Sequence, residues 1–180
     1  MPFVVGCPEP LAAQSIVNAA ISFCEDAMVV WRDLTPVSLV AGQSTYALTT
    51  PTDQQVTRVL AARTARQLHL LSQSPDLSLS SSQGDPSGIY TTRADGTLSL
   101  VLYPTPDKDG TLTVTAALRP VRGATTLDND LYDRWIDAVV AGAVHRITSV
   151  PGTSFFDPNM AGSAAVAAVR GANKARIEGS

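Results

Sequence analysis

The spacing of apolar residues changes twice along the sequence, and this pattern sets the class of fold. Apolar residues recur every three or four positions from 11 to 31, which is typical of an amphipathic helix. From 36 to 118 they alternate with polar residues, as in half-buried strands, and after 129 the helical spacing returns. This order predicts an α+β fold in which terminal α-helices pack as a helical bundle, with an inserted antiparallel β region of about six strands.

The β region holds the clearest local signals. Segments 37–40 and 45–48 flank the turn sequence AGQ, and segments 89–93 and 97–103 flank ADG, so each pair predicts a β-hairpin. A strand at 111–118 follows the turn sequence DG and is expected to lie antiparallel beside 97–103. Its apolar face consists of Leu112, Val114, Ala116 and Leu118.

The remaining part of the β region is less regular. Two short runs of leucine and β-branched residues, 55–63 and 67–71, are also predicted as strands. Segment 72–88 is rich in Ser, Pro and Gly, and we expect it to form a long surface loop.

A long helix is predicted at 129–148. Asp128 or Asn129 can cap its start, because short polar side chains accept hydrogen bonds from the first backbone amides. Its apolar arc is wider than one sheet contact needs, so a further element or molecule is expected to cover part of it.

A last helix is predicted at 158–170. Asp157 and Pro158 suit its first positions, and its apolar residues are mostly Ala and Val. We therefore predict a single domain over 1–170, followed by a flexible polar C-terminal segment over 171–180.

The overall charge argues against a nucleic-acid-binding protein. Thirteen basic and sixteen acidic residues give a net charge of -3, whereas tight phosphate binding depends on clustered Lys and Arg. The N-terminal stretch lacks the basic residues of a signal peptide, and no apolar run approaches the ~20 residues of a membrane span, so we expect a soluble protein made in a cytoplasm. Cys7 and Cys24 are isolated in the sequence and are interpreted as reduced thiols.

No arrangement of residues predicts catalysis, a cofactor or a metal ion. His69 and His145 lack a nucleophile in a recognisable elbow, and no phosphate-binding glycine motif is present. Asp130, Asp133 and Asp137 could imitate a metal cluster, but acidic residues near a helix N-terminus are better explained by the helix dipole. We therefore predict that the protein is not an enzyme and that it acts through shape and assembly.

Seven segments carry a resemblance to a known family. In chain order they are CPEP, ISFCEDAMVVWRDL, VAGQSTYALTTP, LYPTPD, LTVTAALRP, LYDRWIDAVVAGAVHRI and PGTSFFDP. Segments of this kind occur in the same order in head-to-tail adaptor (connector or neck) proteins of tailed bacteriophages, and the chain resembles that family from Cys7 to Pro158.

The resemblance implies a structural virion protein at the head-tail junction, assembled in the host bacterial cytoplasm. Such adaptors form a ring, commonly of twelve copies, beneath the portal protein. The ring extends the DNA channel, through which genomic DNA passes without specific binding, and it provides the platform for a downstream neck or tail protein. The resemblance implies no cofactor and no membrane contact, and it makes 171–180 a docking tail. It places subunit or portal contacts at Leu131, Tyr132, Trp135, Ile136, Val139, Ile147, Ala172, Asn173, Lys174, Arg176 and Ile177.

Two alternatives remain open at this point. The chain could be a different neck or tail protein, such as a tail terminator or a tail-tube component. It could also be a small β-rich module that binds a ligand through the loop at 72–88.

Overall fold

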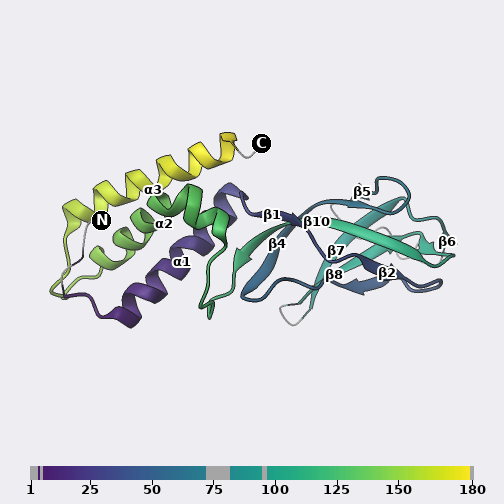
Figure 1. Ribbon diagram of the computed structural model, residues 1–180, viewed down its shortest axis with the longest axis horizontal. Coiled ribbons are helices and arrows are strands. Elements are labelled where there is room, and N and C mark those ends of the chain that lie inside the picture. The colour runs from purple at the N-terminus through teal and green to yellow at the C-terminus, as the bar shows by residue number, and fades with distance from the viewer. Residues whose placement is uncertain (1–3, 5, 72–81, 95–96, 179–180) are drawn as a thin grey trace. The chain divides into compact units, whose positions relative to one another are not determined.

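The computed structural model describes residues 4, 6–71, 82–94 and 97–178, and it has a mixed α+β fold (Figure 1). Residue contacts group the chain into two compact units, where the sequence predicted one domain. We call the first the helical unit, which consists of Met1–Val30, Thr52–Gln55 and Leu118–Ser180. The second, the β unit, consists of Trp31–Pro51 and Val56–Ala117.

Three helices form most of the helical unit. They are α1 (Glu9–Ala27), α2 (Asn129–Thr148) and α3 (Pro158–Glu178), and α2 packs between the other two (Figure 1). Glycines permit a close approach on both sides of α2. A Cβ added at Gly142 would lie 3.2 Å from the Ala19 Cβ on α1, and one added at Gly171 on α3 would lie 2.4 Å from the Ala138 Cβ.

The start of α2 confirms the sequence prediction. Asp128 is the N-cap, and its Oδ1 accepts a hydrogen bond from the Asp130 amide at 3.0 Å. Its Oδ2 accepts a second bond from the Gln54 side-chain amide at 2.9 Å. Asp128 is almost fully buried, so these bonds offset the cost of removing its carboxylate from water.

The end of α1 differs from the prediction. The helix ends at Ala27, because Met28 adopts a left-handed conformation with φ of 51° and donates its amide to the Cys24 carbonyl. Trp31, predicted as the last helical residue, lies in a strand of the β unit. The apolar run across residues 28–31 fits both periods, which is why the sequence pattern placed the boundary too late.

The predicted end of the last helix at residue 170 is also corrected. Asp157 caps the start of α3 by accepting from the Asn159 and Met160 amides, as its sequence position indicated. The helix then continues to Glu178, so the segment expected to be flexible is helical up to that residue. Ala172 and Ala175 are buried, and this packing explains why a polar-looking segment is ordered.

The strands form three sheets. In the first, β10 pairs with β1, β2 and β4; the second has the order β3-β8-β7-β5; and the third consists of β6 and β9. The predicted region was antiparallel with about six strands, whereas the described residues form ten strands, and the pairs β5-β7 and β6-β9 are parallel. The strands are β1 (Trp31–Asp33), β2 (Val37–Leu39), β3 (Thr45–Ala47), β4 (Gln54–Arg63), β5 (His69–Leu70), β6 (Gln83–Gly84), β7 (Gly88–Ala94), β8 (Thr97–Tyr103), β9 (Thr105–Pro106) and β10 (Gly110–Pro120).

The first predicted hairpin is wrong, although both of its strands exist. Strand β2 pairs with β10, and β3 pairs with β8 in a different sheet. The Tyr46 hydroxyl donates to the Gln43 carbonyl at 2.8 Å and accepts from the Val40 amide at 3.1 Å. The Tyr46 hydroxyl therefore satisfies backbone groups between β2 and β3 that would pair with each other in a two-stranded hairpin.

The second predicted hairpin is confirmed by β7 and β8, which pair antiparallel along their whole length. Residues 95–96 of its turn, and 72–81 of the predicted loop, lie outside the described residues. The expected pairing of 97–103 with 111–118 is wrong, because β8 and β10 belong to different sheets. The apolar face predicted for β10 is correct, since Leu112, Val114, Ala116 and Leu118 are all buried.

Asp53 anchors Thr52–Gln55, the short segment from the middle of the chain that belongs to the helical unit. Its Oδ2 accepts hydrogen bonds from the backbone amides and hydroxyls of Thr125 and Thr126 at 3.0 to 3.3 Å. Its own carbonyl accepts from the Val121 amide at 2.9 Å. The hydrogen bond from the Thr125 amide is the main reason that the pKa of Asp53 lies below its ordinary value.

The close approach at Gly171 makes a stability prediction. We expect Gly171→Ala to destabilise the helical unit by about 1 to 3 kcal/mol, because the new methyl group would lie 2.4 Å from the Ala138 Cβ and 3.3 Å from its Cα. Gly162→Ala, in the same helix, is the matched control, because its added Cβ meets no atom within 4 Å. The higher helix propensity of alanine should therefore stabilise the helical unit by about 0.5 to 1 kcal/mol. Urea denaturation followed by circular dichroism measures both, and stabilisation by Gly171→Ala would contradict the packing.

The environment of Asp53 makes a prediction about pH. A lowered folded-state pKa contributes stability that is fully present above the unfolded pKa of about 4 and is lost as pH falls through the folded value. Asp53→Asn should therefore lower the melting temperature at pH 7, and the difference from the native chain should shrink on acidification. Asparagine also tolerates the positive φ of 62° at this position. The same exchange at the exposed Asp107 controls for loss of one surface carboxylate, and parallel pH profiles at both positions would refute the assignment.

Candidate interaction surfaces of the helical unit

The structure divides the eleven residues predicted for subunit or portal contacts into two groups. Those that are exposed or half-buried are Tyr132, Ile136, Asn173, Lys174, Arg176 and Ile177. Those that are buried within the chain are Leu131, Trp135, Val139, Ile147 and Ala172.

The buried group forms the core of the three helices. The Trp135 ring packs against Phe23 of α1, with ring centroids 5.9 Å apart, and Leu131 and Val139 are each 1% exposed. Both apolar stripes of α2 looked alike in the sequence, because periodicity does not say which stripe another helix covers. The candidate contact residues are therefore narrowed to the exposed positions.

The outer side of α3 is one exposed apolar surface. Val166, Val169 and Ile177 are 51%, 59% and 78% exposed, and their spacing places them on one side of the helix. Arg170 and Lys174 follow the edge of this stripe, one helical turn apart. We define the α3 basic face as Val166, Val169, Arg170, Asn173, Lys174 and Ile177.

Sequence reasoning missed half of this face. Asn173, Lys174 and Ile177 were predicted as contact residues, but Val166, Val169 and Arg170 were not. The signal was available, because Val166, Val169, Asn173 and Ile177 recur at three- and four-residue intervals. It was hidden by the alanines between them, of which Ala172 and Ala175 are buried on the other side of the same helix.

The outer side of α2 is a second apolar stripe with acidic edges. Tyr132 is 66% exposed, while Ile136 and Val140 are half-buried and follow it at intervals of four residues. Asp133 and Asp137 are exposed beside this stripe, one turn apart. We define the α2 acidic face as Tyr132, Asp133, Ile136, Asp137 and Val140.

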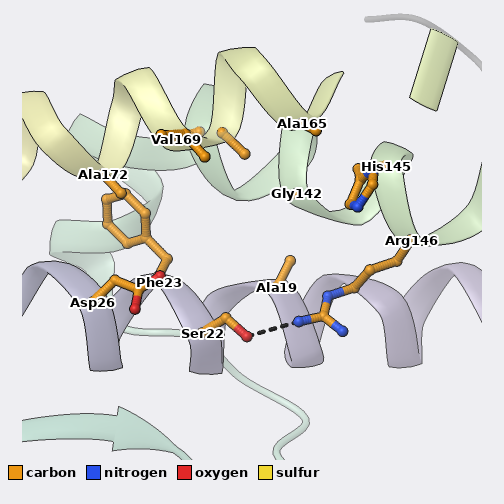
Figure 2. A pocket seen from close by; sticks show the side chains of 12 residues that line it. Ala19, Ser22, Phe23, Asp26, Gly142, His145, Arg146, Ala165, Val169 and Ala172 are labelled. Atoms are coloured by element: carbon orange, nitrogen blue, oxygen red, sulfur yellow. Dashed lines mark hydrogen bonds between the residues drawn. The ribbon is translucent and has the colours of Figure 1, made fainter. Parts of the chain in front are cut away.

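A shallow groove of about 330 Å³ lies among the three helices (Figure 2). Its walls are mainly small residues, including Ala19, Gly142 and Ala165, and the Phe23 ring extends from α1 toward α3. The Arg146 guanidinium donates to the Ser22 hydroxyl at 2.7 Å and so joins α2 to α1. The groove is therefore held by the packing of small residues and by hydrogen bonds between the helices.

Ser149 and His145 form a close pair that resembles a nucleophile and its base, with Ser149 Oγ 3.4 Å from His145 Nδ1. The His145 Nδ1 lies 3.0 Å from the Ala161 carbonyl oxygen, which can only accept, so this nitrogen carries the hydrogen. It therefore cannot take a proton from Ser149, whose hydroxyl donates to the His145 carbonyl at 2.6 Å. Both residues act at the end of α2, where they satisfy and cross-link backbone carbonyls.

The Cys24 thiol is also unsuited to nucleophilic chemistry. Cys24 lies on α1 and is fully buried near the start of α2. This burial, assisted by the charges of Asp128 and Glu25, raises the pKa of its thiol to about 12. The thiolate is the reactive form, so Cys24 is protonated at neutral pH. Cys7 is half-buried near the N-terminus of α1.

No group of three or more His, Cys, Asp or Glu residues within the described part of the chain is placed to hold a metal ion. Among the helices that the structure describes, none is both long and apolar enough to cross a membrane.

Exposed apolar faces with charged edges are features of a protein that acts through assembly. The sequence matches the SU10 adaptor protein family over residues 6–178. The chain therefore belongs to this family, which is a family of phage head-to-tail adaptors, and the predicted resemblance is confirmed. Membership implies a place at the head-tail junction of the virion, with portal and tail proteins as partners. No curated protein matches the sequence.

The contrast between the two cysteines gives a test of the core. In the folded protein we expect an aromatic disulfide reagent to modify Cys7 readily and to leave Cys24 unmodified until denaturant is added. The release of the coloured thiolate measures the reaction. Cys7→Ser should then show almost no reaction in the folded state, and rapid modification of that variant would contradict the burial of Cys24.

Proposed function

We propose that copies of this chain form a ring beneath the portal protein, extend the DNA channel and present a platform for a neck or tail protein. The observation that carries this proposal is the family match over residues 6–178, which includes all three helices and the whole β unit. In this proposal the protein is a structural component that acts without catalysis or a cofactor.

The exposed faces of the helical unit support assembly into a ring. A ring needs two different surfaces on each subunit, because every copy contacts the next in a head-to-tail manner. The α2 acidic face and the α3 basic face are two such surfaces, and they differ in charge. A ring of about twelve copies, as in related adaptors, would match the usual symmetry of a portal.

The charge of the chain supports passage of DNA without specific binding. A net charge of -3 gives little attraction for phosphate, so DNA could slide through the ring without being held.

In the α+β arrangement, the exposed residues Asn173, Lys174, Arg176 and Ile177 remain candidates for subunit or portal contact. The C-terminal segment would dock as a helix, since α3 extends to Glu178.

Mixing the protein with purified portal rings tests this function. We expect one additional ring of density on one side of each portal by electron microscopy, and native mass spectrometry should give the number of copies. Protein incubated without portal, at the same concentration, is the control for self-association. Portals without added density would contradict the proposal, and density that repeats along a tail tube would favour a tube component.

Deletion of 171–180 is a poor test of docking, because it removes Ala172 and Ala175 from the core as well as any contact surface. A substitution confined to the exposed side avoids this problem. Ile177→Asp should reduce ring formation on the portal while leaving the melting temperature nearly unchanged, since Ile177 is 78% exposed. Unchanged ring formation would remove the C-terminal turn from the proposed contacts.

A further inference from the structure

The charges on the outer side of α3 are almost all positive. Arg170 and Lys174 are exposed along its last three turns, and Glu178 is the single acidic residue in the helix. Arg176 instead donates two hydrogen bonds to the Asp26 carbonyl of α1, at 3.0 and 3.2 Å. Lys174 lies 3.7 Å from Glu178, but both side chains are exposed, so this ion pair is weak and Lys174 can exchange partners. The α3 basic face therefore offers an apolar strip with a positive edge.

The outer side of α2 has the opposite charge. Asp133 and Asp137 form its edge beside Tyr132, Ile136 and Val140. The helix dipole accounts for acidic residues only within the first turn, and Asp137 lies beyond that turn. Arg170 lies two turns before the C-terminus of α3, so the helix dipole does not explain its position either.

The order of residues around each helix fixes how the two faces could meet. At 100° per residue, both charged pairs lie on the clockwise side of their apolar strip when each helix is viewed from its N-terminus. Two facing helices bring such edges together only when they run antiparallel. Asp133 and Asp137, like Arg170 and Lys174, are four residues apart, so in that orientation Asp133 meets Lys174 and Asp137 meets Arg170.

We propose that the α2 acidic face of one copy binds the α3 basic face of the next copy in an antiparallel helix pair, with Asp133 opposite Lys174 and Asp137 opposite Arg170. The α3 strip is long enough to cover the α2 strip, since Val166 to Ile177 spans about 16.5 Å and Tyr132 to Val140 about 12 Å. The inference rests on the proposed function, because it names the contact by which copies would form the ring.

The second copy is the occupant that the chain itself supports. Its own surface supplies a strip of matching period, sufficient length and opposite charge, and the two faces are different surfaces of one molecule. A contact between unlike faces repeats from copy to copy and closes into a ring when the rotation permits. Two cations are also few for binding DNA phosphates, which normally needs a larger cluster.

Charge reversal tests the pairing. Asp133→Lys with Asp137→Lys, or Arg170→Glu with Lys174→Glu, should each reduce ring formation on the portal by about tenfold or more, because like charges then face each other. A chain that carries all four changes should recover to within about twofold of the native chain, and an equimolar mixture of the two single-face variants should also assemble. Arg93→Glu with Lys108→Glu, two exposed changes in the β unit, is the matched control and should have no effect.

Cysteine cross-linking tests the orientation in a Cys7→Ser background. Mixing a Tyr132→Cys copy with an Ile177→Cys copy should give a disulfide-linked dimer, and Val140→Cys with Val166→Cys should do the same. Tyr132→Cys with Val166→Cys should not cross-link, because an antiparallel pair places these residues at opposite ends. Dimers from Tyr132→Cys alone would indicate a symmetric contact between two α2 helices and would overturn the proposal.

The outcomes separate the two proposals. If the native chain forms rings on the portal and both charge-reversal variants form them equally well, the helix pairing is overturned and the adaptor function stands. A second outcome would also overturn the helix pairing. If Arg170→Glu with Lys174→Glu prevents even one copy from attaching to the portal, and the four-change chain does not recover, then α3 contacts the portal and not the next copy. If native protein forms no ring on the portal, the adaptor proposal fails, and the cysteine pairs decide the helix pairing in concentrated protein alone.

Discussion

The close packing of α2 against both neighbouring helices is the constraint on which the helical unit depends. Gly142 and Gly171 remove side chains at the two points of contact, so the backbones of α1 and α3 approach α2 more closely than larger residues would permit. This packing turns the alanines of α3 inward and its valines and Ile177 outward. The outer surfaces of the unit are therefore a direct result of where these two glycines lie.

The sequence predicted elements better than it predicted their partners. The bounds of α2 and its Asp128 cap were correct, because a long period and a capping residue are local signals. Strand β10 was placed with the correct buried face but beside the wrong strand, since a period of two identifies a face and not a neighbour. The end of α3 was missed because Ala172 and Ala175 are stabilised by packing that composition does not reveal.

The candidate contact surface was predictable in part. Tyr132 was identified from its place in an apolar stripe and Ile177 as part of the predicted docking tail, and both are exposed. Trp135 and Val139 lie in similar stripes to Tyr132 but are buried. The difference depends on which side of α2 is covered by α1 and α3, and only tertiary structure supplies this. The proposed pairing of opposite charges on α2 and α3 likewise depends on which sides of these helices are exposed.

The two sides of α3 are subject to different evolutionary constraints. At Gly171 even one added methyl group overlaps the Ala138 methyl group on α2, so substitution on the inner side is restricted by sterics. On the outer side, Val169 and Ile177 contact mainly solvent within the chain, so substitutions there leave the core unchanged. If α3 makes the proposed contact, a few surface substitutions would change what it binds and leave the packing that presents it unaltered.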